Sequence, residues 1–95
     1  MNMEQLNREE QYLVLENRNI VYKVIKKFGV TQNSPDYEDL VSIGILGLIK
    51  ASMSYKEGKA TFSTYAFSCI HNEIANFYKK AQKYANDIYI EYLKK

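Results

Sequence analysis

The sequence predicts an all-α protein: a compact bundle of three main helices, at about 8–28, 35–54 and 62–83, with a short C-terminal tail. Two observations favour helices. Four Gly and one Pro among 95 residues leave few breaks, and apolar residues recur at helical intervals in the three segments. Apolar residues make up 46% and charged residues 25%, the balance of a globular chain. We therefore expect one domain with one modest core.

Composition excludes several classes of protein. The single Cys excludes a disulfide framework and a Cys-based zinc site, and indicates a reducing cytoplasm. The longest apolar run, Ile43 to Ile49, has seven residues, far short of the roughly 18–20 of a membrane span. The first residues lack a signal peptide's basic and apolar segments. We expect a cytoplasmic protein with no membrane, metal or cofactor.

The first helix, 8–28, is predicted by Leu13, Ile20, Val24 and Phe28, spaced seven, four and four residues apart. Gly29 follows as a stop signal, because Gly adopts the left-handed cap without steric cost.

The second helix, 35–54, is predicted to start with Ser34 as N-cap and Pro35 at the first helical position, where a missing N–H needs no partner. Gly44, Gly47 and Ala51 then fall on one face, which indicates a neighbouring helix too close for side chains. Apolar residues occupy nearly the whole remaining circumference. Some of that surface should stay open for a partner, although a central helix of a larger assembly has the same pattern.

The third helix, 62–83, is predicted to be capped by Thr61 or Ser63. After Tyr84 the helical pattern weakens, and residues 87–92 alternate like an extended segment. Its expected inward stripe is Phe62, Ala66, Cys69 or Ile70, Glu73 or Ile74, and Phe77.

An enzyme is not expected. His71 is the single histidine, and both Cys69 and Glu73 lie two residues from it, a spacing that points helical side chains apart. No Gly-rich phosphate loop and no Ser/His/Asp set is present in the sequence.

Charge and aromatic residues gather in the second half. Residues 1–49 carry a net charge of −2 and residues 50–95 a net charge of +4, with nine of the thirteen aromatic residues from Tyr55 onward. Phe62 and Tyr65 stand three apart on one side of the third helix. Such rings beside cations suit unpaired nucleobases, but ordinary core anchors have the same spacing. The cations near in sequence are Lys56, Lys59, Lys79, Lys80 and Lys83.

Two ordered motifs carry a resemblance to a known family. Asp39-Leu-Val-Ser-Ile-Gly44-Ile-Leu-Gly47-Leu-Ile-Lys-Ala51 and Phe62-Ser-Thr-Tyr-Ala66 resemble region 2 of bacterial RNA polymerase sigma factors of the sigma-70 family. Asn17, ahead of Lys26-Lys-Phe28, is similar to the matching first helix. The wording of the first motif is more similar to sporulation-type or other alternative sigma factors of low-GC Gram-positive bacteria than to a housekeeping one.

The resemblance implies a domain at 1–84, with 85–95 as a linker or truncated tail. It also implies binding of core RNA polymerase, with the second helix on the clamp helices of the largest subunit, and an anti-sigma factor as a further partner. Primary sigma factors carry Gln, Glu and Asn where Ser42, Ile43 and Ile45 stand, so apolar contacts are expected here. The expected polymerase-binding residues are Glu38, Asp39, Ser42, Ile43, Ile45 and Ile49.

The resemblance further implies that the loop and third helix recognise and melt the minus-ten promoter element and hold flipped bases of its non-template single strand. Tyr65 matches the aromatic residue that stacks where the duplex opens. Ser68 and Cys69 stand in place of a paired Trp. The expected DNA-binding residues are Asn17, Ile20, Tyr55, Lys56, Lys59, Phe62, Ser63, Tyr65, Phe67, Ser68, His71, Asn72, Asn76 and Lys79. The alternative is a helical interaction module, or an anti-sigma-like regulator, that binds polymerase without reading DNA.

Overall fold

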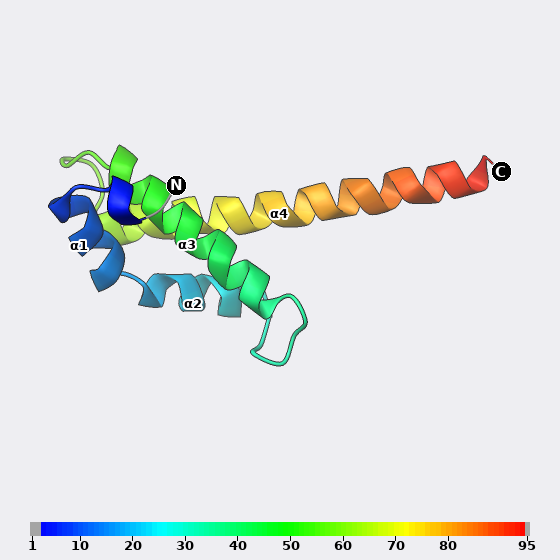
Figure 1. Cartoon of the computed structure of the whole chain (residues 1–95), viewed down its shortest axis with the longest axis horizontal. Coiled ribbons are helices and arrows are strands. Elements are labelled where there is room, and N and C mark those ends of the chain that lie inside the picture. Colours follow the sequence, from blue (N-terminus) through cyan, green and yellow to red (C-terminus); the bar gives the residue numbers. More distant parts are fainter. Residues whose placement is uncertain (1–2, 95) are drawn as a thin grey trace.

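The computed structural model describes residues 3–94, which are all helix and connecting loop without a strand (Figure 1). The all-α prediction is confirmed, but the prediction of three main helices is wrong, because the described residues form four α-helices. The elements are the short 3-10 helix η1 (Met3–Gln5) and helices α1 (Arg8–Glu16), α2 (Asn19–Lys27), α3 (Tyr37–Ser54) and α4 (Phe62–Leu93).

The predicted first helix is broken at Asn17 and Arg18, which separate α1 from α2. The Asn17 side chain donates a hydrogen bond from Nδ2 to the carbonyl oxygen of Leu13 at 2.8 Å. The Asn17 backbone N–H donates to the carbonyl oxygen of Val14 at 3.2 Å. Asn ends helices readily because its side chain competes for backbone groups. The break lets both short helices turn apolar residues to the core, namely Val14, Ile20, Val21, Val24 and Ile25.

Local signals fix the outer ends of this pair. Asn7 caps α1 in a capping box, accepting from the Glu10 backbone N–H at 2.8 Å while the Glu10 carboxylate accepts from the Asn7 N–H at 2.9 Å. Gly29 follows α2 with a φ of +78°, and its N–H donates to the carbonyl oxygen of Lys26 at 2.9 Å. The predicted glycine stop is therefore confirmed.

The start of α3 lies two residues beyond its predicted position. Asp36 is the N-cap, and Pro35 lies in the preceding turn. The Ser34 hydroxyl accepts a hydrogen bond from the Asp36 N–H at 3.4 Å, and the Tyr37 N–H bonds the Ser34 carbonyl oxygen at 3.2 Å. This tight turn uses Ser34 before the helix begins, so its predicted capping role is wrong.

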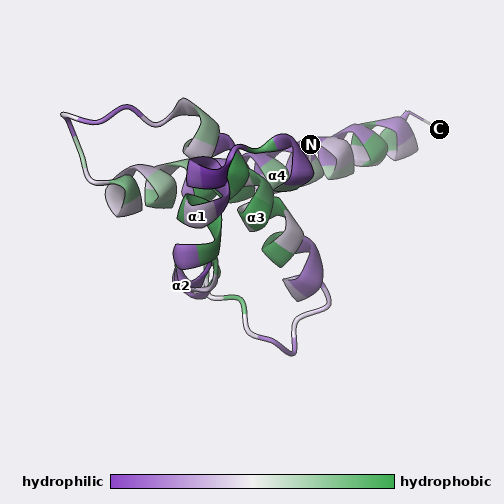
Figure 2. Cartoon of the chain, turned by 60° about the vertical axis from the view of Figure 1, so that its left-hand side comes forward, coloured by the Kyte–Doolittle hydropathy of each residue, from purple (hydrophilic) through white to green (hydrophobic). Residues whose placement is uncertain are grey.

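The glycine face of α3 is approached by two helices, α2 at Gly44 and α4 at Gly47. A Cβ on Gly44 would lie 2.6 Å from Cγ1 of Val21, and one on Gly47 would lie 3.0 Å from Cα of Ile70 and 3.2 Å from the Cys69 carbonyl oxygen. The close approach predicted from the sequence is confirmed. In Figure 2 the hydrophobic middle of α3 lies against α4.

Helix α4 starts as predicted and ends later than predicted. Thr61 is its cap, with Oγ1 accepting from the Thr64 N–H at 3.3 Å. The helix then continues to Leu93, so the expected extended tail is wrong as far as the described residues reach; Lys95 lies outside them. After Gly58 the chain has no Gly or Pro to stop a helix. The buried stripe is Phe62, Ala66, Ile70 and Ile74.

The core is enclosed by α1, α2, α3 and the first half of α4, whereas the second half of α4 extends beyond them (Figure 1). The molecule consequently measures 55 × 27 × 26 Å. Among the helices that the structure describes, none combines the length and the apolar character needed to cross a membrane.

Candidate nucleic-acid and polymerase interfaces

Three rings meet where α3 ends and α4 begins. Tyr55 contacts Phe62 edge to face, with ring centroids 5.3 Å apart, and contacts Tyr65 at 5.8 Å with a tilt of 43°. The Tyr65 hydroxyl lies 2.7 Å from the Ser54 hydroxyl, and the Tyr55 hydroxyl donates to the Ala60 carbonyl oxygen at 2.8 Å. Both tyrosines are therefore held in place at their outer ends.

These tyrosines line an open hollow of about 380 Å³, which we call the first hollow. Its wall is mainly apolar ring surface, and the exposed Lys56 and Lys59 stand at its edge. A flat aromatic group can stack on such a wall while lysines contact attached phosphates. The lining residues are Ser54, Tyr55, Lys56, Glu57, Lys59, Ala60 and Tyr65.

The two rings predicted to stack on bases lie in different environments. Phe62 is only 9% exposed and belongs to the core, whereas Tyr65 is half-buried and borders the first hollow. Phe62 thus supports Tyr55 from below. The core-anchor interpretation, left open by the sequence, describes Phe62, whereas Tyr65 packs against the core with one side and borders the first hollow with the other.

A second hollow, of about 340 Å³, lies where α2 meets α4. Ser63 donates from Oγ to Oδ1 of Asn17 at 3.4 Å across this junction. Ile20 is 7% exposed and forms part of the floor. The structure therefore brings together five predicted residues from distant parts of the chain, namely Asn17, Ile20, Ser63, Phe67 and Ser68. The lining residues are Ile20, Lys23, Ser63, Thr64, Phe67 and Ser68.

The predicted residues farther along α4 lie at its surface, and one of them, Asn76, borders α3 as well. Ser68, His71, Asn72, Asn76 and Lys79 are all exposed. Asn72, Asn76 and Lys79 are spaced four and three residues apart and so share one side of the helix.

His71 is flanked by rings, which the sequence analysis did not foresee. Its ring centroid lies 4.9 Å from that of Phe28 and 6.5 Å from that of Phe67, and the Phe67 and His71 planes differ by 19°. Phe28 comes from the end of α2, so the contact needs the tertiary fold.

The predicted polymerase residues on α3 are not equally accessible. Glu38, Asp39 and Ser42 are exposed, Ile43 and Ile45 are half-buried, and Ile49 is 6% exposed within the core. Ile49 consequently offers little surface to a partner in this structure.

The apolar surface that α3 does leave open continues onto α4. A shallow groove of about 180 Å³, the α3–α4 groove, joins Ile43 to Phe77 of α4. Beside it, Lys50 Nζ and Glu73 Oε1 form an ion pair at 2.7 Å that links the two helices. Leu46, Phe77 and Lys80 were not among the predicted partner residues; Leu46 lies three residues after Ile43, a spacing that could have indicated it. The groove is lined by Ile43, Leu46, Glu73, Asn76, Phe77 and Lys80.

Comparison with known proteins identifies the family. A model described as Sigma-70 region 2 matches residues 13–84, most of the chain. The chain belongs to this family, and the resemblance inferred from its two motifs is confirmed.

Its relatives include RNA polymerase sigma factors of low-GC Gram-positive bacteria. It is 43% identical over 88 residues to the RNA polymerase sigma-28 factor of Bacillus thuringiensis subsp. kurstaki, covering 90% of this chain and 36% of that protein. It is 49% identical over 63 residues to the RNA polymerase sigma-K factor of Bacillus subtilis (strain 168), covering 65% and 21%. A sigma-E factor of Clostridium acetobutylicum is 34% identical over 77 residues, covering 80% and 32%. The chain thus spans about a third or less of the length of these relatives. No solved structure gives a significant match.

Proposed function

We propose that this domain works as the region of a sigma factor that binds core RNA polymerase and recognises and melts the minus-ten promoter element. Family membership supports the general role. The single observation that carries the DNA part is the first hollow, where the half-buried Tyr65 stands beside two exposed lysines.

The chemistry of the first hollow suits an unpaired base. A base extruded from the duplex can stack on the Tyr65 ring, whose position is fixed by Ser54 and Tyr55. Lys56 and Lys59 are near enough in the wall to offset the charge of its phosphates. The second hollow, lined by Ile20, Ser63 and Phe67, offers a place for a further base.

The free energies of base flipping and of aromatic stacking explain why melting needs polymerase. Flipping a base out of the stack costs a few kcal/mol, and an aromatic stack returns roughly 1–3 kcal/mol. These terms nearly cancel for one or two bases. The domain alone should therefore bind single strands modestly and duplex promoter DNA weakly, and melting should require that polymerase hold both.

For polymerase we propose the surface formed by α3 and the α3–α4 groove, docked on the clamp helices of the largest subunit. The exposed Glu38 and Asp39 lie in the first turn of α3, and Ile43 leads from there to the apolar groove. This surface is separate from the first hollow, so polymerase and DNA can bind together.

Tyr65→Ala tests the proposal. Open complexes with core RNA polymerase should fall about ten-fold or more, because a stacking platform is lost, while polymerase binding stays unchanged. The readouts are permanganate reactivity on a pool of promoter fragments with a randomised minus-ten segment, and a pull-down of polymerase.

Tyr84→Ala is the matched control, because Tyr84 is 69% exposed on the protruding half of α4. A module that binds polymerase without reading DNA predicts no difference between the two variants. Equal open-complex formation by both, with both folded, would refute the DNA part of the proposal.

A further inference from the structure

The outer side of α2 carries an uncompensated positive charge. Lys23, Lys26 and Lys27 are exposed, and residues 19–27 contain no Asp or Glu. Among the described residues, the one ion pair with an N–O distance below 4 Å joins Lys50 to Glu73. The three lysines of α2 therefore have no acidic partner within that part of the chain. Their spacing of three and four residues places them on one side of the helix.

Lys27 is held in place by a ring rather than by a carboxylate. Its Nζ lies 5.0 Å from the ring centroid of Phe67, a geometry that stabilises a cation by about 0.5–1 kcal/mol at exposed sites. Phe67 stacks on His71, and His71 in turn contacts Phe28, which stacks on Tyr78 at 5.8 Å. We call these four residues the ring ladder. The ladder supports the Phe67 ring, over which Lys27 lies.

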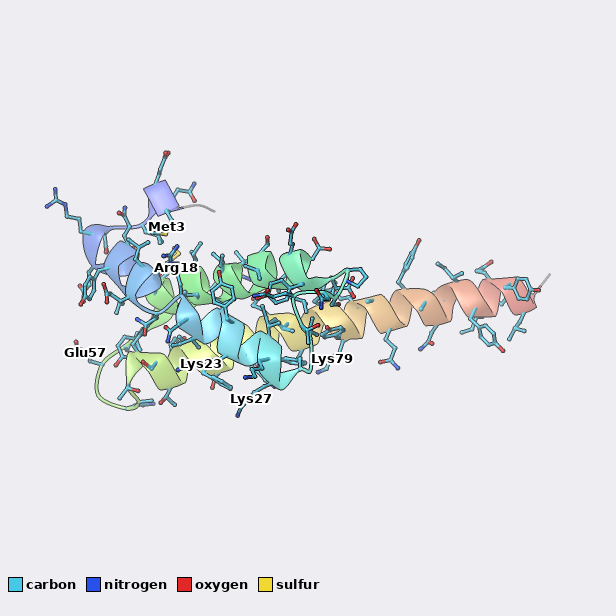
Figure 3. The ribbon with its side chains drawn as sticks, turned by 90° about the horizontal axis from the view of Figure 1, so that it is seen from below. Met3, Arg18, Lys23, Lys27, Glu57 and Lys79 are labelled. Atoms are coloured by element: carbon cyan, nitrogen blue, oxygen red, sulfur yellow. The ribbon has the colours of Figure 1, made fainter. Side chains whose placement is uncertain are left out.

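The lysines begin where the second hollow ends. Lys23 lines that hollow together with Ile20 and Phe67. Beyond Lys27 the ring ladder leads to Tyr78 of α4, next to the exposed Lys79. Figure 3 shows Lys23, Lys27 and Lys79 in this order along the molecule, towards the protruding half of α4.

We propose that Lys23, Lys27 and Lys79 form a track that binds successive phosphates of the DNA whose unpaired bases enter the hollows; this rests on the proposed function. Lys23 and Lys27 are four residues apart, about 6 Å along the helix axis. A DNA strand carries one phosphate per roughly 3.4 Å of axis, so flexible lysines at this interval reach separate phosphates.

The burial of α2 argues against an anionic membrane as the partner. Helices that bind a lipid surface insert an apolar side beneath their cations. In α2 that apolar side, formed by Val21, Val24 and Ile25, is enclosed in the core. Only the charged side is available, which suits phosphates at the surface of a nucleic acid.

The test measures salt dependence with the whole 95-residue chain and core RNA polymerase. The affinity for fluorescent forked DNA, a duplex arm joined to a randomised single strand, is compared with the affinity for the single strand alone. Both are measured at KCl concentrations from about 50 to about 300 mM. Lys23→Gln/Lys27→Gln should weaken binding about ten-fold at low salt. It should also lower the slope of log affinity against log salt by about 1.8 for duplex phosphates or about 1.4 for single-strand phosphates.

Lys83→Gln/Lys94→Gln is the matched control, because it removes the same charge from exposed positions of α4 outside the proposed track. Its slope should equal that of the unchanged chain. Lys27→Arg keeps both the charge and the ring contact and should retain affinity. Thermal unfolding checks that each variant is folded; Lys23→Gln alone, with an expected slope change near 0.9 on duplex DNA, serves if the double variant is not.

The outcomes separate this inference from the proposed function. A smaller slope on forked DNA alone assigns the phosphates to the duplex arm, and a smaller slope on both probes assigns them to the single strand; either supports the track. An unchanged slope, in an experiment where Tyr65→Ala weakens binding, overturns the track and leaves the proposed function standing. If the unchanged chain with polymerase binds neither probe, both are overturned.

Discussion

The two halves of α4 have similar residues and different surroundings. The first half, Phe62 to Tyr78, is packed on α2 and α3, and its Ile70 and Ile74 are fully buried. The second half, Lys79 to Leu93, is exposed at every described position, including Ile88 and three tyrosines. A tyrosine in the first half, Tyr65, borders a shaped hollow because α3 and the loop surround it. An aromatic residue therefore becomes a candidate binding group when neighbouring elements hold its ring at the wall of a hollow.

The largest expected effect compares one residue type in both halves. Ile70→Ala should lower the free energy of unfolding by about 2–5 kcal/mol, because it leaves a cavity beneath Gly44 and Gly47. Ile88→Ala, at a position 51% exposed, should change it by less than about 0.5 kcal/mol. Urea unfolding followed by circular dichroism measures both. Equal losses would mean that the second half is packed as firmly as the first.

A second comparison introduces a larger side chain into each of the two regions. Gly47→Leu should cost about 3 kcal/mol, because even a Cβ at Gly47 would lie within 3.2 Å of α4 backbone atoms. Asn86→Leu adds a side chain of the same kind to the protruding half and should be neutral within about 0.5 kcal/mol. The same unfolding measurement applies. Tolerance of leucine at position 47 would show that α3 and α4 are not in close contact.

The smallest expected effect concerns charge. A double-mutant cycle with Lys50→Gln and Glu73→Gln should give a coupling energy of about 0.2–1 kcal/mol that decreases in 1 M salt, because the pair is partly exposed. Lys83 and Asp87, four residues apart in the protruding half, should couple by no more than about 0.5 kcal/mol. A larger coupling for the second pair would contradict the view that contacts between helices define the packed half.

Much of the fold could be predicted from local sequence. The glycine end of α2, the glycine face of α3 and the capped start of α4 each follow from a short-range physical rule, and each is confirmed. The break at Asn17 was missed because apolar periodicity continues across it; the hydrogen bonds from Asn17 to the carbonyl oxygens of Leu13 and Val14 mark the end of α1. The end of α4 was missed because alternating apolar residues also fit a helix, and the described residues 3–94 include no strand with which the segment could pair.

The candidate site was only partly predictable, since burial depends on tertiary contacts. The motif beginning at Phe62 shows which residues are near one another, but not that Phe62 faces inward while Tyr65 borders a hollow. The ring ladder joins Phe28 to His71, residues far apart in the sequence, so no local pattern could have predicted it. The sequence of α2 did carry a signal, because its nine residues contain three lysines and no acidic residue. That signal indicates a phosphate-binding surface only once the structure places the lysines beside the second hollow.

The close approach at Gly47 also has a mechanical consequence. With backbone against backbone, α3 and α4 must rotate as one body, and α4 is a single uninterrupted rod from Phe62 to Leu93. Its 32 residues span about 48 Å at about 1.5 Å each. If α3 is seated on a larger partner, a tilt of about 5° about the crossing at Ile70 would move the far tip, about 35 Å away, by about 3 Å. A small change in the orientation of the domain on its partner would thus produce a larger displacement at the C-terminal end of α4.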